Sequence, residues 1–188
     1  ITGYIRKGAA FNGSSSYINI DSFNFPTNNF TVSCWIKADN VAIANTNIIT
    51  SVKSGSGFFA MGLATDKLTY TAVYSSGSTT VTSAVGSISN NVWYHCLATQ
   101  SSTTGIKLYL NGNLVDSNAT TTNLRTTNSG QNRIGHYYSP TSGAFFDGSI
   151  DQVRIFNTAL NSTQVGQLAL ETYADPKKST TDYFGDGS

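Results

Sequence analysis

Short runs of β-branched and aromatic residues, separated by Gly, Asn and Ser, recur along most of the chain. Runs of this length, bounded by turn-forming residues, are typical of antiparallel β-strands. They predict strands at residues 16–20, 30–38, 47–52, 57–64, 67–74, 79–85, 92–100, 106–117, 132–138 and 149–156. Because helical periodicity is almost absent between the runs, the sequence predicts an all-β sandwich or barrel.

The clearest turn in the sequence is Leu110-Asn111-Gly112-Asn113. Asn followed by Gly tolerates the positive φ angles that a type I′ turn requires. We therefore predict a tight hairpin, with residues 106–110 and 113–117 as its two strands.

One helix is predicted near the C-terminal end, within residues 158–171. Asn161 is a favourable N-cap, and Gln164 stands at the third helical position, as in a capping box. Leu160 and Val165 occupy the positions of a hydrophobic staple. Gly166 weakens the helix, so we expect only about two turns.

The chain has 188 residues, which suits one large domain with or without a linker. After Tyr173 the composition changes to ADPKKSTTDYFGDGS, in which Pro, a Lys pair and small polar residues resemble a linker. We predict a single module at residues 1–173, and a linker or the start of a following module at residues 174–188. The chain begins at Ile1 without a signal sequence, so we expect it to be a segment of a longer protein.

Charged residues make up 11% of the chain, and the formal net charge is +1. Lys and Arg are scattered singly, which argues against nucleic-acid binding because no basic stripe follows a phosphate backbone. No apolar run approaches the ~18 residues of a membrane span, so membrane insertion is not expected. Ser, Thr, Asn and Gly supply the polarity instead, as in secreted and virion-surface β-proteins. We therefore expect an extracellular or virion-surface location.

Cys34 and Cys96 are the two cysteines, and each lies in a predicted strand. No Cys/His spacing typical of a zinc site is present. The sequence leaves two interpretations open. The cysteines are either two small core residues in neighbouring strands or, in an extracellular protein, one disulfide.

Several runs together resemble the laminin G and pentraxin group of the concanavalin A-like lectin/glucanase superfamily. They occur in the same order as in that group, cover nearly all of residues 8–170, and read GAAFNGSSSYINI, NNFTVSCWIKA, WYHCLATQ, IKLYLNGNLV, RIG and FFDGSIDQVRIFNTALNSTQVGQL. The resemblance implies a jelly-roll sandwich of two antiparallel sheets with one short C-terminal helix. Cys34 and Cys96 stand close to the pentraxin disulfide positions, with Cys34 offset by one residue.

The resemblance also implies a function. Modules of this group in secreted, cell-surface and phage proteins mostly bind glycans or other proteins. We therefore expect a non-catalytic, lectin-like module of a larger phage or bacterial surface protein, with a glycan or surface polysaccharide as partner. The alternative is a structural or adhesive module, a spacer or decoration domain that contacts only neighbouring protein modules.

Asp151 poses a specific problem in the run FDGSIDQVRIF. Strand alternation would put its carboxylate on the same face as Val153 and Ile155, where an unpaired charge is costly. In related glucanases an acid on a similar strand ligates a structural calcium. The resemblance therefore implies that Asp151 ligates calcium with the backbone carbonyls of Asn12 or Gly13. The other interpretation is that Asp151 accepts backbone N–H bonds or pairs with an Arg.

Catalysis is not expected, although the superfamily contains glycoside hydrolases. That chemistry needs two carboxyl groups about 5–10 Å apart. The chain has one glutamate, Glu171, and on a regular strand Asp147 and Asp151 would stand about 13 Å apart. His95 lacks a recognisable nucleophile motif beside it and is predicted to be a structural strand residue.

Sugar recognition combines aromatic faces with amides and hydroxyls, because sugar C–H surfaces pack on aromatic rings while sugar hydroxyls need hydrogen bonds. The densest such mixture is QNRIGHYYSPTSGAFF, residues 131–146. Tyr74 is a second candidate beside a flexible loop. The predicted ligand-binding residues are Tyr74, Asn132, Arg133, His136, Tyr137 and Tyr138.

Overall fold

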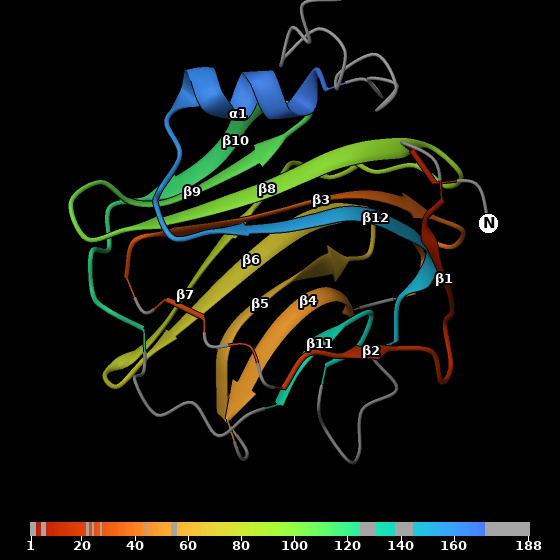
Figure 1. Ribbon diagram of the computed structural model, residues 1–188, viewed down its shortest axis with the longest axis horizontal. Coiled ribbons are helices and arrows are strands. Elements are labelled where there is room, and N and C mark those ends of the chain that lie inside the picture. The colour runs from red at the N-terminus through yellow and green to blue at the C-terminus, as the bar shows by residue number, and fades with distance from the viewer. Residues whose placement is uncertain are drawn as a thin grey trace, which may run out of the picture.

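Over the residues that the structure describes, the protein is a sandwich of two six-stranded antiparallel sheets with one helix on its outer surface (Figure 1). The computed structural model describes residues 3–4, 7–21, 23, 25–26, 28–43, 45–53, 56–124, 131–137 and 145–171. The predicted ligand residue Tyr138 and the predicted linker at 174–188 lie outside these residues. The prediction of an all-β, two-sheet jelly roll with a short C-terminal helix is confirmed.

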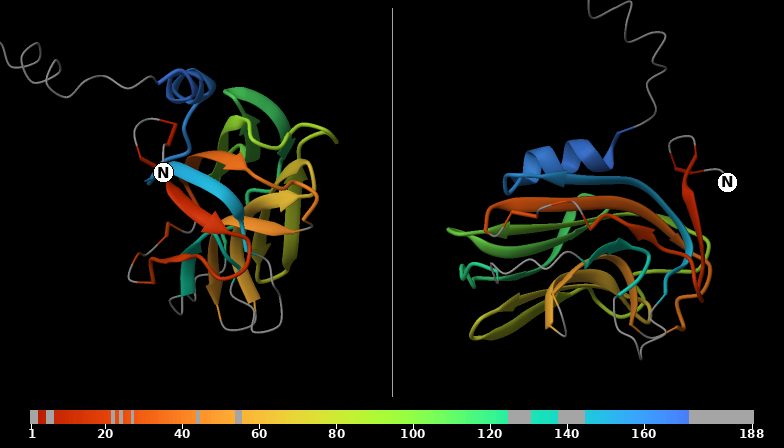
Figure 2. Two further views of the ribbon diagram at one scale, coloured as in Figure 1. Left: turned by 90° about the vertical axis from the view of Figure 1, so that its right-hand side faces the viewer. Right: turned by 60° about the horizontal axis from the view of Figure 1, so that its bottom comes forward.

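The first sheet has the strand order β1-β12-β3-β8-β9-β10. Its strands are β1 (Ala9–Asn12), β3 (Phe30–Ala38), β8 (Trp93–Ser101), β9 (Gly105–Leu110), β10 (Asn113–Asn118) and β12 (Asp147–Phe156). The second sheet has the order β2-β11-β4-β5-β6-β7. Its strands are β2 (Ile18–Asn19), β4 (Thr46–Lys53), β5 (Ser56–Ala64), β6 (Lys67–Tyr74), β7 (Gly77–Thr82) and β11 (Gln131–Ile134). Figure 2 shows the two layers face to face, with the strands of the second sheet bent.

The core fills the space between the two sheets, because alternate side chains of each strand point inward. In β6 the alternation is regular, and every second residue from Leu68 onward is buried. The bulkiest fully buried side chains include Phe30, Phe59, Tyr70 and Phe146. Within the described residues, no helix has the length and apolar character to cross a membrane.

The predicted Asn-Gly hairpin is confirmed as β9 and β10. Asn111 has φ 50° and Gly112 has φ 81°, the positive values that such a two-residue turn requires. The side chain of Asn111 also accepts a hydrogen bond from the backbone N–H of His95, at 2.9 Å. The turn therefore holds β9 and β8 together as well as closing its own hairpin.

The predicted helix is confirmed as α1 (Ser162–Ala169), with Asn161 as N-cap. The capping box is complete, because Asn161 accepts from the Gln164 backbone and Gln164 accepts from the Asn161 backbone, each at 3.0 Å. α1 lies across the outer face of the first sheet (Figures 1 and 2). There Val165 packs with Leu97 and Tyr109, and Leu160 joins the same small cluster.

Two strand predictions need correction. β1 was not among the predicted strands, although its residues pair with β12 from Ala9↔Ile150 to Asn12↔Asp147. The strand predicted at 132–138 ends at Ile134, because Gly135 has φ 85° and turns the chain.

The predicted facing of Asp151 is wrong. A bulge lies between Asp151 and Arg154, and Gln152 has φ 48°. Because a bulge shifts the register by one residue, Asp151 lies opposite Trp35 on the outer face, while Val153 and Ile155 pack against the core. Asp151 is covered there by the N-terminal segment, since a Cβ added at Gly3 would meet its carboxylate oxygen at 2.5 Å.

Cys34 and Cys96 are direct partners in the register of β3 and β8. Both are buried in the core and both are free thiols. The one-residue offset from the pentraxin pattern therefore does not turn Cys34 away from Cys96. Burial raises the pKa of the Cys34 thiol, and burial followed by the proximity of Cys34 raises the pKa of Cys96.

Candidate binding surface

Asn132 joins three segments of the second sheet and is fully buried. Its side-chain oxygen accepts from Ser51 Oγ at 2.7 Å, and its side-chain nitrogen donates to the backbone oxygen of Phe23 at 2.6 Å. Its backbone N–H donates to Asp21 Oδ1 at 2.8 Å. Asn132 thus fixes β11 against β4 and the chain after β2, and its amide does not face the surface.

Arg133 points to the opposite side of β11, the outer face of the second sheet. Its guanidinium carbon lies 4.4 Å from the ring centroid of Tyr17, a cation–π geometry. Tyr17 precedes β2, and 46% of its surface is exposed. Tyr17 was not among the predicted ligand-binding residues. The sequence does contain a signal for it: in the predicted strand SYINI, Tyr17 and Asn19 are two residues apart, so both lie on the face opposite Ile18.

His136 completes this arrangement just after β11. Its Nδ1 lies 3.0 Å from Arg133 Nη1, so the arginine donates and the imidazole accepts. Its ring stacks on Phe145, with centroids 3.8 Å apart and planes inclined by 15°. The Tyr17 and His136 centroids are 5.8 Å apart. We call Tyr17, Arg133, His136 and Phe145 the edge cluster.

The backbone holds the edge cluster in place. Thr50 Oγ1 donates to the backbone oxygen of His136 at 2.9 Å, and His136 forms an isolated β-bridge with Phe145. Phe146 N–H donates to the Gly135 oxygen at 2.8 Å. These bonds fix two loop segments to β4, so the stacked rings are supported by the sheet rather than by the loops alone.

The remaining predicted ligand residues lie elsewhere. Tyr137 is half-buried and follows His136 in the chain. Tyr74 is buried among the core side chains, with 5% of its surface exposed. A ring between the sheets does not contact a ligand at the surface, so Tyr74 is not part of the candidate surface.

Beyond the edge cluster, the outer face of the second sheet carries small side chains. The register aligns Arg133 with Thr50, Thr50 with Ala60, Ala60 with Thr71, and Thr71 with Thr80. The hydroxyls of Thr71 and Thr80 are 2.9 Å apart. This row is uncharged after Arg133, and its exposed hydroxyls can donate to or accept from a ligand.

The three predicted calcium ligands do not meet. Asn12 is the register partner of Asp147, whereas Asp151 lies four residues further along β12, or about 13 Å away. The carboxyl group of Asp147 lies against Gly13, since a Cβ there would be 3.0 Å from Asp147 Cγ. The predicted set of Asp151, Asn12 and Gly13 therefore does not form one site. No group of three or more His, Cys, Asp or Glu side chains suited to a metal occurs among the described residues.

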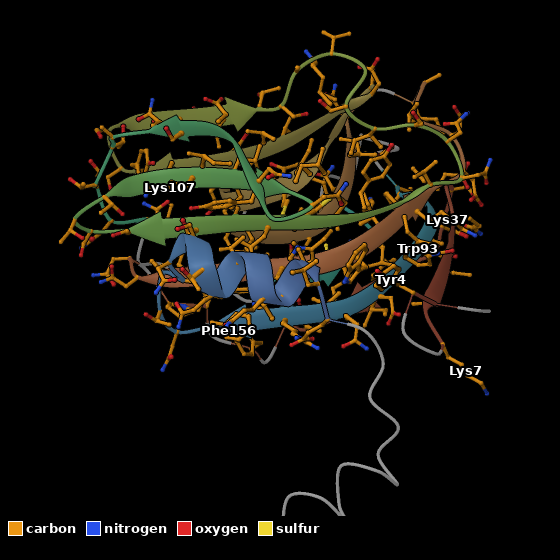
Figure 3. The ribbon with its side chains drawn as sticks, turned by 90° about the horizontal axis from the view of Figure 1, so that it is seen from above. Tyr4, Lys7, Lys37, Trp93, Lys107 and Phe156 are labelled. Atoms are coloured by element: carbon orange, nitrogen blue, oxygen red, sulfur yellow. The ribbon has the colours of Figure 1, made fainter. Side chains whose placement is uncertain are left out.

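The outer face of the first sheet holds a second group of aromatic rings. Tyr4 stacks on Trp35 with centroids 3.4 Å apart, and it meets Trp93 edge-on at 6.0 Å. Lys37 lies over the Trp93 ring at 5.8 Å. Figure 3 shows Tyr4, Trp93 and Lys37 together at one end of this sheet. The Tyr4 ring covers Trp35, which is 7% exposed, while Tyr4 itself is 38% exposed.

His95 lies next to Trp35, and its Nε2 is 2.8 Å from Ser33 Oγ. Burial, and to a lesser extent the nearby charge of Arg154, lowers the pKa of His95 to about 4. The side chain is 2% exposed, as expected for a structural strand residue. A shallow surface depression lies beside it, and Arg154 and Glu171, which line it, form an ion pair at 2.5 Å.

Comparisons with known proteins agree with this fold. A family model described as the concanavalin A-like lectin/glucanases superfamily, of the laminin G type, matches residues 12–166. No curated protein sequence matches the chain.

Solved structures with the same fold include binding domains. Domain 4 of AbnA, an extracellular arabinanase from Geobacillus stearothermophilus, in complex with arabinotriose, is 21% identical with a TM-score of 0.64, and the match covers 90% of this chain and 79% of that one. The CBM40 domain of the Ruminococcus gnavus IT-sialidase, bound to α2,3-sialyllactose, is 11% identical with a TM-score of 0.70. The match covers 87% of this chain and 97% of that one. The binding domain of Paraclostridial Mosquitocidal Protein 1 is 18% identical with a TM-score of 0.70, and the match covers 90% of this chain and 44% of that one.

At these identities the structural matches establish the fold alone. The family match covers most of the chain, from β1 to α1, and agrees with the two antiparallel sheets and the capped helix. The chain therefore belongs to the concanavalin A-like lectin/glucanases superfamily.

Proposed function

We propose that this protein is a non-catalytic carbohydrate-binding module whose ligand lies on the outer face of the second sheet, at the edge cluster. The observation that carries the proposal is the Tyr17 ring, which is 46% exposed although Arg133 lies 4.4 Å from its centroid. An exposed aromatic ring held by a neighbouring side chain loses little freedom when a ligand packs on it.

The chemistry of this surface suits a sugar. The C–H faces of a sugar ring pack on aromatic surfaces, and the exposed Tyr17 ring supplies one, while His136, which is 5% exposed, lies 5.8 Å from it as a buried neighbour. Sugar hydroxyls require donors and acceptors, and Thr71, Thr80 and Asn19 offer them on the same face.

Fold relatives lend support to a binding role. One was solved with arabinotriose and another with α2,3-sialyllactose, and a third is the binding domain of a toxin. The first of them is domain 4 of an extracellular arabinanase, which supports the proposal that this chain is one module of a larger extracellular protein, with neighbouring modules as partners.

Absence of catalysis is part of the proposal. Asp147 and Asp151, the two acids of β12, are separated by about 13 Å along the strand, further than the carboxyl pairs of either glycosidase mechanism. Ser33 and His95 form a hydrogen bond on the other sheet, but His95 is buried beside Trp35 and Ser33 is 2% exposed. A substrate therefore has no access to that hydroxyl.

A glycan array with the wild-type protein tests the proposal, with Tyr17→Ala as the critical variant. We expect wild-type binding to at least one glycan class and a loss of about 10-fold or more in Tyr17→Ala. Tyr4→Ala is the matched control, because Tyr4 is a similarly exposed tyrosine (38%) on the outer face of the first sheet. Equal losses in both variants, with unchanged melting temperatures, would place the binding site away from the edge cluster.

The rival function is protein binding by a structural or adhesive module. The toxin binding domain among the fold relatives keeps it open, and exposed apolar side chains at Val85 (78%) and Leu114 (53%) are compatible with it. If no glycan binds and the module instead self-associates or docks onto its flanking modules, the rival function is the correct one.

A further inference from the structure

The core between the two sheets contains three polar side chains that face one another from opposite sheets. Tyr70 and Tyr74 belong to β6 in the second sheet, and Gln100 belongs to β8 in the first. Tyr70 and Gln100 are at most 1% exposed, and Tyr74 is 5% exposed. The Tyr70 ring stacks on Phe59 with centroids 5.8 Å apart. Phe59 in turn lies 5.5 Å from Phe30, which is the register partner of Gln100.

Three buried oxygen atoms of this group have no hydrogen-bond partner within the part of the chain that the structure describes. They are the hydroxyl oxygens of Tyr70 and Tyr74 and Oε1 of Gln100. The Gln100 side-chain nitrogen donates to the backbone oxygen of Thr122 at 3.4 Å, which sets the orientation of the amide and leaves its oxygen for another donor. Buried polar atoms in folded proteins find a partner in about 90% of cases, so three orphans in one place call for a bridging group.

The three groups lie close enough to influence one another. Burial raises the pKa of Tyr70, and the proximity of Tyr74 raises it further. Burial also raises the pKa of Tyr74, and the side chains of Thr79 and Gln100 oppose this rise, so both lie near the hydroxyl. Polar groups that interact without a direct hydrogen bond are commonly joined by a water molecule between them.

We propose that a buried water molecule bridges Tyr70, Tyr74 and Gln100 and thereby ties the two sheets together. Water matches the donors and acceptors, because it accepts one hydrogen bond from each tyrosine hydroxyl and donates one to Gln100 Oε1. Three partners are the usual number for a buried water molecule. A metal ion fits less well, because all three oxygens are neutral and a buried charge needs compensation. The inference is independent of the proposed function.

A high-resolution crystal structure of the whole chain tests the site directly. We expect one peak of electron density within about 2.5–3.0 Å of all three oxygens, the range of O–H···O hydrogen bonds. A map without that peak overturns the inference.

Tyr70→Phe and Tyr74→Phe provide a second test in solution. Each removes one hydroxyl and keeps the ring, so each should lower the melting temperature by about 2–5 °C, as expected for one hydrogen bond in a protein of this size. Tyr4→Phe is the matched control and should leave the melting temperature unchanged, because Tyr4 is 38% exposed on the outer face of the first sheet. The double variant should lose less than the sum of the two single losses, since both hydroxyls bind one water molecule. Single variants as stable as the control, or fully additive losses, overturn the inference.

Discussion

Asp151 lies directly opposite Trp35 in the register of β12 and β3, on the outer face of the first sheet. Simple alternation would have placed it with Val153 and Ile155, which pack against the core. The bulge between them keeps the carboxylate out of the core between the sheets, and Asp151 is buried instead (7% exposed) beneath the N-terminal segment. The backbone N–H of Gln152 donates to Asp151 Oδ1 at 2.7 Å, so the carboxylate also stabilises the bulge that positions it.

The first prediction concerns Gln152, whose φ of 48° is uncommon for a residue with a side chain. Gln152→Val should lower the free energy of unfolding by about 1–3 kcal/mol, because a β-branched residue is strained in this conformation. Both Gln152→Val and Gln152→Gly lose the hydrogen bond that Arg154 donates to the Gln152 side chain, but glycine adopts the positive φ without strain. Urea unfolding measures the free energy of unfolding of both variants. A smaller loss in Gln152→Val than in Gln152→Gly would contradict a positive φ at this position.

Local signals in the sequence predicted the parts of the fold that depend on neighbouring residues. Asn111 and Gly112 fix a turn by their own φ preferences, and Asn161 with Gln164 closes a cap within four residues. Asp151 could not be placed in this way, because its facing depends on a bulge at a non-glycine residue. Tyr17 was missed for a related reason: it joins Arg133 only through the pairing of β2 with β11, which are over 100 residues apart in sequence.

The second prediction concerns the two thiols, which are buried and have raised pKa values. Since the thiolate is the reactive form, a protein purified under reducing conditions should not react with Ellman's reagent while folded. Both thiols should react once denaturant is added. Rapid reaction of the native protein would contradict the buried pairing.

The same assay distinguishes the two interpretations that the sequence left open. Cys34 and Cys96 are register partners on adjacent strands, so a disulfide can form without a change in strand pairing. Protein secreted into an oxidising medium either yields two thiols in denaturant or none until reductant is added. The second result identifies the disulfide.

The third prediction concerns calcium, which the resemblance implies and which stays a prediction. If the protein binds calcium near Asn12 and Gly13, chelator should lower the melting temperature, and Asp147→Asn should remove this response because Asp147 lies against Gly13. Asp151→Asn is the matched control on the same strand and should retain the response. Loss of the response in Asp151→Asn alone would favour Asp151 as the calcium ligand. A melting temperature that changes with neither calcium nor chelator would mean that the protein has no structural calcium.

The last prediction concerns pH and His95. Burial is the main reason that its pKa is lowered from 6.5 to about 4, and the charge of Arg154 adds to it. Below pH 6.5 the unfolded chain therefore binds a proton at His95 that the folded protein does not. This linkage destabilises the folded state progressively between pH 6.5 and pH 4, by an amount on the order of a few kcal/mol, and has no effect above pH 6.5.

Carboxylates also titrate near the lower end of this range, so a variant is needed to isolate the histidine. His95→Gln retains a side-chain donor toward Ser33, which lies 2.8 Å from the imidazole, but it does not titrate. The free energy of unfolding, measured in urea from pH 8 to pH 4, should fall less steeply in the variant than in the wild type. The difference should begin near pH 6.5, because that is where the unfolded histidine becomes protonated. Parallel curves for the two proteins would mean that His95 is protonated in the folded state, which its burial beside Trp35 opposes.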